Sequence, residues 1–136
     1  MTESSGPGPR RPGVLVVEDE AILRDLLEQA LPPHGFTVWA AAGAADAVEA
    51  LARHPEQIDA ALVDLRLPGL DGPDTVAALR GVRPGLPCCL MGGDADPEDP
   101  RLLATGCPCL RKPFHLAEVV RQLRALIDRP PEGGVA

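Results

Sequence analysis

Three acidic residues and one lysine stand at positions where they could bind a metal ion and a phosphate group together. Glu18, Asp19 and Asp64 each end a short apolar segment, and Lys112 comes shortly after another. Carboxylates that lie close together repel one another unless a hard cation neutralises them, and Mg²⁺ accepts one or two carboxylates together with phosphate oxygens. A lysine ammonium adds a compact positive charge that stabilises a phosphoryl oxygen. The residue types therefore indicate metal-assisted phosphoryl chemistry, in which an aspartate binds or accepts the group.

The lysine also stands out in the composition. The chain contains 13 basic residues, and Lys112 is the single lysine among them. A composition so biased towards arginine favours a chemical reason for this lysine, because a slim ammonium enters a small pocket more readily than a broad guanidinium fork. The alternative is a surface lysine retained by chance.

Two kinds of apolar segment alternate along the chain and predict the elements that position these residues. Buried strands are expected where apolar, β-favouring residues follow one another, at 14–17, 36–41, 60–63, 86–91 and 107–110. Amphipathic helices are expected at 22–31, 44–51, 73–81, 97–104 and 116–127, the fourth of them short. This alternation predicts an α/β fold, a doubly wound parallel sheet with helices on both faces. Ligands bind such sheets beyond the carboxyl ends of the strands, where the acidic residues and Lys112 lie.

Length, composition and charge bound the class of function. The 136 residues, 45% of them hydrophobic, suit one compact domain, expected at 13–129 between a flexible tail or linker at 1–12 and a flexible tail at 130–136. The formal net charge of −7 argues against binding of nucleic acid by this chain, which requires clustered cations. No apolar run approaches the length of a membrane span, and the start of the chain has no signal-peptide core. We therefore expect a cytoplasmic protein without membrane contact.

Four cysteines occur as two close pairs, Cys88–Cys89 and Cys107–Cys109. Neither spacing is typical of a zinc or redox motif, and both pairs lie in apolar, strand-like segments, where cysteine behaves as a small hydrophobic residue. We interpret them as core residues, with metal binding or a disulfide as the alternative. Cys88 and Cys89 are neighbours in a strand, so their side chains are expected on opposite faces of the sheet.

Three segments resemble the receiver domain of response regulators, the CheY-like module of two-component signalling. Val14–Glu20 is similar to the first strand of that family with its acidic pair, Asp59–Gly72 to the segment around its phospho-acceptor, and Lys112–Phe114 to its lysine–proline ending. The resemblance covers 13–129, with every element in order. It implies the flavodoxin-like receiver fold, a five-stranded parallel sheet of order 2-1-3-4-5 with five helices, and a cis Lys112–Pro113 peptide bond.

The resemblance also implies a role for each site residue. Asp64 is expected to take a phosphoryl group from a phosphohistidine on a histidine kinase or a histidine phosphotransfer protein. Asp19, Asp64 and the backbone carbonyl of Arg66 are expected to bind Mg²⁺, with Glu18 acting mainly through a metal-bound water. Lys112 is expected to pair with a phosphoryl oxygen. Such a protein is not a conventional enzyme, because it catalyses at most its own phosphorylation and dephosphorylation.

Two positions depart from the family pattern. The serine or threonine expected at the end of the fourth strand falls on Gly92, which keeps a backbone N–H for a phosphoryl oxygen but has no hydroxyl to move towards it. The aromatic switch residue expected in the fifth strand falls on Cys109, after a connection that is one residue short. We therefore expect the phosphorylation chemistry to be intact and the transmission of the signal to be altered or weak.

Two alternatives compete with a phosphoryl-accepting receiver. Phosphatases of the haloacid dehalogenase type also use an aspartate nucleophile, but they need a second aspartate two residues later, where this chain has Arg66. A pseudo-receiver, a binding module that a partner recognises without phosphorylation, is the second hypothesis. The set of Glu18, Asp19, Asp64 and Lys112 favours the acceptor.

The output in either case is expected to be contact with an unidentified downstream protein. The segment after Arg129 contains no DNA-binding or catalytic sequence, so the surface of the fourth helix, fifth strand and fifth helix is expected to make this contact. Because the fourth helix is short, we expect little or no phosphorylation-driven dimerisation through that surface.

Overall fold

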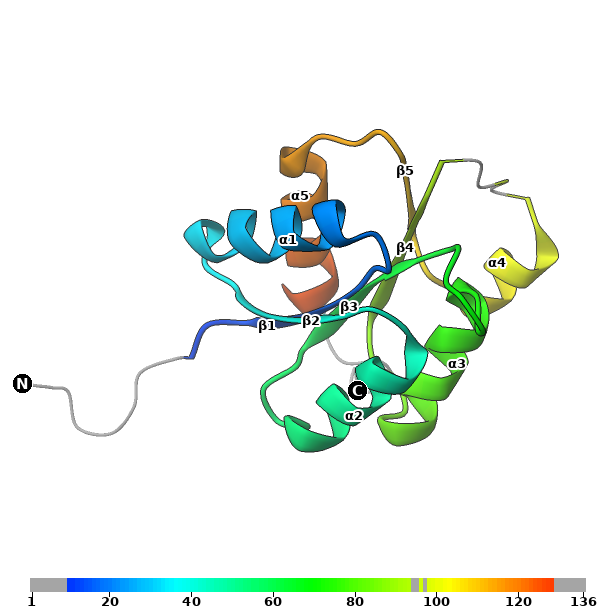
Figure 1. Cartoon of the computed structure of the whole chain (residues 1–136), viewed down its shortest axis with the longest axis horizontal. Helices are drawn as coiled ribbons and strands as arrows, with labels where there is room; N and C mark the ends of the chain where they lie inside the picture. Colours follow the sequence, from blue (N-terminus) through cyan, green and yellow to red (C-terminus); the bar gives the residue numbers. More distant parts are fainter. Residues whose placement is uncertain (1–9, 94–95, 97, 129–136) are drawn as a thin grey trace, which may run out of the picture.

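The computed structural model describes residues 10–93, 96 and 98–128 and shows a parallel β-sheet with helices on both faces (Figure 1). In this part of the chain the strands are β1 (Gly13–Val17), β2 (Thr37–Ala41), β3 (Ala60–Asp64), β4 (Cys88–Gly92) and β5 (Cys109–Arg111). The helices are α1 (Ala21–Ala30), α2 (Ala44–Arg53), α3 (Gly72–Val82), α4 (Pro100–Thr105) and α5 (Leu116–Asp128), with a short 3₁₀ helix, η1, at Pro32–His34. The strand order β2-β1-β3-β4-β5 and these helices confirm the predicted flavodoxin-like fold.

The central strands are buried on both faces because their residues are apolar throughout rather than alternating. Every residue of β1, β3 and β4 is buried. In β1, Leu15 and Val17 pack into the core on one face of the sheet, and Val14 and Val16 pack into the core on the other. Because both faces of these strands are packed, the position of each strand end is fixed, and the site residues lie at these ends.

Figure 1 shows α1 and α5 on one face of the sheet and α2 and α3 on the other. Leu27 of α1 and Leu123 of α5 are buried in one core, and Leu51 of α2 and Leu79 of α3 are buried in the opposite one. α4 packs beside α3 and adds Leu102 to the second core. Because helices cover both faces, a ligand reaches the sheet at the ends of its strands.

The buried side of α1 is narrower than the sequence pattern indicated. Leu23 and Leu27 face the core, whereas Ile22 and Leu26 are 79% and 59% exposed. Successive helical residues point about 100° apart, so a helix lying on a sheet buries one stripe and leaves the neighbouring stripe in solvent. The predicted amphipathic helix is present, and the spacing puts Ile22, Leu23, Leu26 and Leu27 on one apolar side of it, of which only part is buried.

α4 begins at Pro100 rather than at the expected Pro97, a residue that lies outside the described part of the chain. The Asp99 side chain caps the helix by accepting a hydrogen bond of 2.9 Å from the backbone N–H of Arg101. Pro100 takes the first helical position, where its missing N–H leaves no bond unmade. Gly106 ends the helix in the left-handed conformation, with φ of +69°. The prediction of a short fourth helix is confirmed.

The cysteines divide between the core and the surface. Cys88 and Cys89 are buried and belong to the cores on opposite faces of the sheet, as predicted. Cys107 is half-buried and packs against the core, whereas Cys109 is exposed, so the interpretation as a core residue was wrong for Cys109. β5 is a three-residue strand at the edge of the sheet, and less protein covers it than covers the central strands.

Residues 10–12, expected within the N-terminal tail, contact the domain. Arg10 donates to both carboxylate oxygens of Asp59 at 2.8 and 2.9 Å, and the backbone N–H of Thr37 donates to the Pro12 carbonyl at 2.9 Å. The rest of the expected tails, at 1–9 and 130–136, and Arg129 lie outside the described residues, so the domain boundaries stay predictions. No helix in the described part of the chain is long and apolar enough to cross a membrane.

Candidate metal and phosphate site

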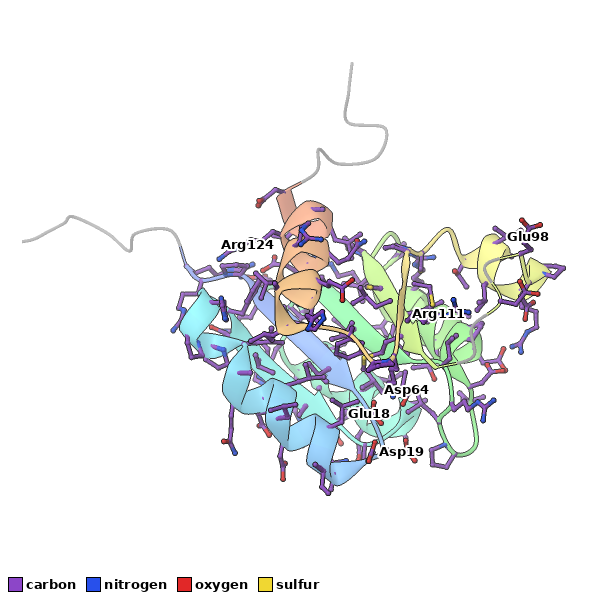
Figure 2. All side chains as sticks on the ribbon, turned by 90° about the horizontal axis from the view of Figure 1, so that it is seen from above. Glu18, Asp19, Asp64, Glu98, Arg111 and Arg124 are labelled. Carbon is purple, nitrogen blue, oxygen red and sulfur yellow. The ribbon has the colours of Figure 1, made fainter. Side chains whose placement is uncertain are left out.

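The carboxyl ends of β1, β3, β4 and β5 surround an open cavity of about 490 Å³. Its lining contains the acidic residues, the lysine and their neighbours: Glu18, Asp19, Glu20, Asp64, Arg66, Gly92, Gly93 and Lys112. Figure 2 shows Glu18, Asp19 and Asp64 together at this end of the molecule, away from Arg124 of α5. The structure thus brings together the residues predicted for the site, except Cys109, which is not among those lining the cavity.

Three carboxylates of this cavity are arranged as a cation could use them. One oxygen atom from each of Glu18, Asp19 and Asp64 lies within 4.8 Å of the others. Mg²⁺ prefers oxygen ligands and keeps several waters, for which the open cavity leaves room. Asp19 is exposed, so a cation can approach this group from solvent. The donor set therefore fits the predicted metal.

Glu18 is the most deeply buried acid of the site, with 1% of its surface exposed. Its carboxylate oxygens accept hydrogen bonds from the Glu20 backbone N–H at 3.0 Å and from Lys112 Nζ at 3.2 Å. Burial raises the pKa of Glu18 to about 7, and the neighbouring Asp64 carboxyl adds to the effect, because each disfavours a charge on Glu18. In the absence of a cation, Glu18 is therefore balanced between its two protonation states near neutral pH.

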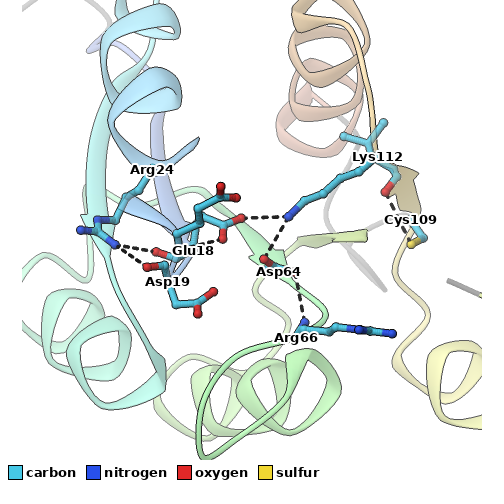
Figure 3. Close-up of polar contacts among 9 residues, drawn as sticks. Glu18, Asp19, Arg24, Asp64, Arg66, Cys109 and Lys112 are labelled. Carbon is cyan, nitrogen blue, oxygen red and sulfur yellow. Dashed lines mark hydrogen bonds and ion pairs between the residues drawn. The ribbon is translucent and has the colours of Figure 1, made fainter. Parts of the chain in front are cut away.

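Asp64 ends β3, and 7% of its side chain is exposed. The Arg66 backbone N–H donates to Oδ1 at 3.1 Å, and Lys112 Nζ donates to Oδ2 at 3.1 Å (Figure 3). Each carboxylate oxygen thus has a donor that orients it in the cavity. Arg66 lines the same cavity, and the metal-binding role expected for its backbone carbonyl stays a prediction.

Lys112 bridges the two buried acids, with Nζ 3.2 Å from Glu18 Oε1 and 3.1 Å from Asp64 Oδ2. Its backbone N–H donates to the Gly92 carbonyl at 2.9 Å, which extends the pairing of β4 and β5. The Lys112–Pro113 peptide bond is cis, as expected. Burial disfavours the ammonium, but its contacts with Asp64 and Glu18 outweigh this effect and raise the pKa of Lys112. The side chain therefore stays positively charged.

Arg24 supports the acidic pair, although no pattern in the sequence pointed to it. From α1, its Nη1 donates to the backbone carbonyls of Glu18 at 2.9 Å and Asp19 at 3.3 Å (Figure 3). This contact ties the turn after β1 to the first helix. A bond from a side chain to the main chain requires no particular partner residue, so no pattern in the sequence could reveal it.

Gly92 lacks a side chain where Leu65 occupies the space. A Cβ atom at Gly92 would lie 2.6 Å from Leu65 Cδ1 and 3.2 Å from Leu65 Cβ. Leu65 directly follows Asp64, so hydrocarbon attached to the neighbour of the candidate acceptor stands where the family pattern has a hydroxyl. The departure at Gly92 is therefore part of a packed contact between β3 and β4.

Gly72 marks a second close approach. A Cβ atom there would lie 2.8 Å from Leu65 Cα and 2.9 Å from the Asp64 carbonyl oxygen. The Gly72 N–H donates to the Leu65 carbonyl at 2.9 Å. The first turn of α3 thus packs with its backbone against the two residues at the end of β3, a role that the sequence motif did not reveal.

Comparisons with known proteins agree with this geometry. A family model described as the response regulator receiver domain matches residues 14–124. The transcriptional regulatory protein PrrA of Mycobacterium tuberculosis is 38% identical over 125 residues, which cover 90% of this chain and 52% of that protein. The probable transcriptional regulatory protein TcrX of the same organism is 36% identical over 118 residues, which cover 85% of this chain and 50% of that protein. The chain therefore spans about half the length of the curated relatives it matches.

A solved structure extends the likeness to three dimensions. The non-phosphorylated HemR receiver domain of Leptospira biflexa has a TM-score of 0.75 and 31% sequence identity to this chain, and the match covers 88% of this chain and 98% of that one. The stretch matched by the family model contains every residue predicted for the site, from Glu18 to Lys112.

Proposed function

The chain belongs to the response regulator receiver family of two-component systems, and we propose that it accepts a phosphoryl group on Asp64 with the help of Mg²⁺. The observation that carries this proposal is one open cavity lined by Lys112 and by the clustered carboxylates of Glu18, Asp19 and Asp64. An ion pair that served only stability would need neither an exposed third carboxylate nor an open space beside it.

Asp64 acts as the nucleophile. A carboxylate oxygen of Asp64 forms a bond to phosphorus while the bond from phosphorus to the donor's histidine nitrogen breaks, and the imidazole leaves with that electron pair. The hydrogen bond of 3.1 Å from the Arg66 N–H orients the carboxylate during the attack. Bound Mg²⁺ supplies positive charge that offsets the clustered carboxylates and the phosphoryl oxygens.

Lys112 stabilises the charge that the phosphoryl group brings. Its ammonium lies 3.1 Å from Asp64 Oδ2, so a phosphoryl group on Asp64 comes within reach of a small rotation of the lysine side chain. The side chain is 26% exposed, and a charge in such a partly desolvated position acts more strongly than one in bulk water. Lys112 can therefore exchange its contact with Asp64 for one with a phosphoryl oxygen.

Incubation with acetyl phosphate and Mg²⁺, followed by intact mass measurement, tests the acceptor. We expect the wild-type chain to gain one phosphoryl group and the Asp64→Asn variant to gain none. The matched control is Asp46→Asn, which removes an exposed aspartate of α2 and should leave the gain unchanged. No gain by the wild-type chain under any condition would support the pseudo-receiver instead.

A phosphodonor kinase is the partner that the family implies, and α1 offers the surface for it. The donor's phosphohistidine must reach Asp64, so the donor protein has to contact the elements around the cavity. α1 starts directly after the cavity residue Glu20 and exposes Ile22 and Leu26. With a phosphorylated kinase that labels the wild-type chain, we expect an Ile22→Ser/Leu26→Ser variant to be labelled slowly while acetyl phosphate still labels it normally.

The pseudo-receiver is the second candidate, and the contact between Gly92 and Leu65 is the observation that favours it. With no hydroxyl at Gly92 and a cysteine at position 109, the usual coupled switch is absent from these two positions. For the phosphoryl-accepting receiver, the first candidate, the same two departures have a different consequence: we propose that phosphorylation changes the surface of α4, β5 and α5 little. Sedimentation with and without beryllofluoride should therefore show a monomer in both cases, and a clear shift to a dimer would contradict this.

Nucleic acid is not a proposed partner of this chain itself. Its formal net charge is −7, and the two relatives named as transcriptional regulatory proteins are about twice as long as the part that it matches. The cytoplasmic location stays a prediction.

A further inference from the structure

A second group of reactive side chains lies outside the cavity around Asp64, where α3 meets the start of β4 and the segment before β5. Arg80 of α3 is fixed there by donating to the Leu86 carbonyl at 3.2 Å and to the Thr105 carbonyl at 2.7 Å. Its remaining nitrogen, Nη2, lies 3.6 Å from Cys107 Sγ. A guanidinium held against a sulfur atom stabilises the thiolate form of that cysteine.

Cys88 stands beside Cys107 in this group. The parallel register pairs Leu90 with Cys109, and the Leu90 N–H donates to the Pro108 carbonyl at 2.8 Å. The same offset, two residues earlier, sets Cys88 next to Cys107, and both residues pack with the core on the same face of the sheet. Neighbouring strands lie about 4.8 Å apart, within the range of about 4.4–6.8 Å between Cα atoms that a disulfide requires.

The two thiols differ in access to solvent. Cys88 is buried with 1% exposure, whereas Cys107 is half-buried. Cys107 opens onto a small pocket, which is lined by Leu102, Leu103, Gly106, Cys107 and Cys109. An oxidant arriving from solvent therefore meets Cys107 before it meets the buried Cys88.

The charge state of the pair follows the same order. The neighbouring Cys88 thiol lowers the pKa of Cys107 against the effect of burial, and Thr105 and Arg80 add to the lowering. The neighbouring Cys107 thiol and burial raise the pKa of Cys88. The accessible thiol is the one that ionises, and the buried thiol keeps its proton.

We propose that Cys107 and Cys88 form a peroxide-sensitive thiol pair that closes to a disulfide across β4 and the segment before β5. The Cys107 thiolate attacks one oxygen of hydrogen peroxide, the O–O bond breaks, and hydroxide leaves, which converts Cys107 to a sulfenic acid. The Cys88 sulfur then attacks the Cys107 sulfur, the S–O bond breaks, and the sulfenic hydroxyl leaves with the Cys88 proton as water, while the hydroxide from the first step takes up the proton that Cys107 had released. Two thiols are oxidised, and one peroxide is reduced to water overall.

The pocket in front of Cys107 determines the class of oxidant. Leu102, Leu103 and Gly106 bring no charge to it, and its volume is about 280 Å³. A small neutral molecule such as hydrogen peroxide fits this setting, whereas a bulky charged disulfide such as oxidised glutathione has no complementary group in this lining. Peroxide is therefore the expected oxidant, and oxidised glutathione the comparison.

Counting free thiols after oxidation tests the pair. The wild-type chain is exposed to hydrogen peroxide, quenched, denatured and labelled with N-ethylmaleimide, and its mass gives the number of labels. We expect the four labels of the untreated chain to fall by two, and dithiothreitol to restore both. In Cys107→Ser the three remaining thiols should all keep their labels, and in Cys88→Ala the oxidation should stop at a dimedone-reactive sulfenic acid on Cys107.

The matched control is Cys109→Ser, which removes a thiol that lies two residues away and is more exposed. This variant should still lose two labels on oxidation. If the loss of two labels disappears in Cys109→Ser or persists in Cys107→Ser, the assignment of the pair is wrong.

A kinetic measurement that needs no core substitution gives a second test. Iodoacetamide labelling is measured at pH 7 in two variants: Cys109→Ser reports the rate of Cys107, and Cys107→Ser reports the rate of Cys109. We expect the Cys107 rate to be about tenfold higher. Arg80→Gln should shift the pH midpoint of Cys107 labelling upward. Equal labelling rates, or a midpoint that Arg80→Gln does not move, would overturn the proposal even if every variant folds.

Discussion

Two regions of the molecule differ in how closely their side chains are held. One is the phosphate edge, formed by Glu18, Asp19, Asp64 and Lys112, and the other is the α4 side. At the phosphate edge, Lys112 contacts both buried acids within 3.2 Å. On the α4 side, the helix has six residues and Leu103 is 64% exposed. A phosphoryl site requires atoms at defined distances, whereas a docking surface is defined by its partner. The residues proposed for the phosphoryl chemistry are thus held at short, defined distances, whereas the helix on the surface expected to transmit the signal is short and exposed.

The largest expected effect comes from removing the ammonium at the phosphate edge. Lys112→Met should slow labelling by acetyl phosphate about 100-fold, because it removes the positive charge that faces the phosphoryl oxygens. Lys112→Arg should not restore the rate, since the guanidinium is broader and forks. The control is Arg111→Met, which removes the neighbouring exposed cation of β5. Equal labelling rates for Lys112→Met and Arg111→Met would show that the charge of Lys112 has no special part in the reaction.

The next effect concerns how tightly α3 packs against the end of β3. Gly72→Ala should lower the free energy of unfolding by about 3 kcal/mol, because the new Cβ meets the backbone of Leu65 and Asp64 at 2.8 and 2.9 Å. Gly81→Ala, in the same helix, is the control, since a Cβ there meets nothing within 4 Å. It should be neutral or slightly stabilising. Urea denaturation of both variants checks this. If Gly72→Ala lowered the free energy of unfolding no more than Gly81→Ala does, the backbone at the end of β3 would be able to move aside for the new Cβ.

The pH dependence of stability should report the buried acid. Because burial raises the pKa of Glu18 from 4.5 to about 7, the folded state holds a proton that the unfolded state has released between these values. The metal-free protein should therefore lose about 1–2 kcal/mol of stability as pH rises from 4.5 to 7, after allowance for screening by solvent in the open cavity.

Denaturation in the presence of a chelator at the two ends of this pH range measures the loss. Glu18→Gln should remove this part of the slope, whereas Glu28→Gln, an exposed acid of α1, should retain it. Mg²⁺ should stabilise the wild-type chain more at the higher pH, because it binds the ionised carboxylates. A slope that Glu18→Gln leaves unchanged would show that Glu18 is not the group responsible.

The smallest effect is expected on the α4 side. Arg101 of α4 pairs with Asp71 at 2.6 Å and with Asp74 at 3.2 Å, and all three side chains are solvent-exposed to a large degree. Exposed ion pairs contribute little, so Arg101→Ala should leave the urea midpoint unchanged, as should the control Arg53→Ala. Amide hydrogen exchange in α4 should nevertheless become faster in Arg101→Ala. A clear fall in the urea midpoint would mean that the α4 side is held more firmly than its contacts indicate.

The sequence predicted the fold well because long apolar runs and helical spacing are local signals. The position of Asp64 after an apolar strand placed it at the sheet edge without any knowledge of its neighbours. The errors have local causes too. Periodicity indicates the apolar side of a helix but not how much of that side is buried, so it could not distinguish the exposed Ile22 and Leu26 of α1 from their more buried neighbours. An apolar segment at a sheet edge resembles a central one, so Cys109 was assigned to the core.

The contacts that the sequence could not predict depend on three-dimensional packing. Arg24 binds backbone carbonyls, and Gly72 and Gly92 approach Leu65, yet none of these contacts leaves a pairing or a period in the chain. The register that sets Cys88 beside Cys107 is likewise a property of the sheet. Charge and spacing along the chain revealed which groups could do chemistry, whereas the contacts that hold those groups in place are visible only in the folded structure.

The packing of Leu65 on Gly92 has a mechanical consequence. Leu65 is covalently joined to Asp64, its backbone N–H donates to the Met91 carbonyl of β4 at 2.8 Å, and its side chain occupies the space that a Cβ atom at Gly92 would need. A displacement of the Asp64 main chain is therefore passed to β4 in both directions, through this hydrogen bond and through the close packing of the Leu65 side chain.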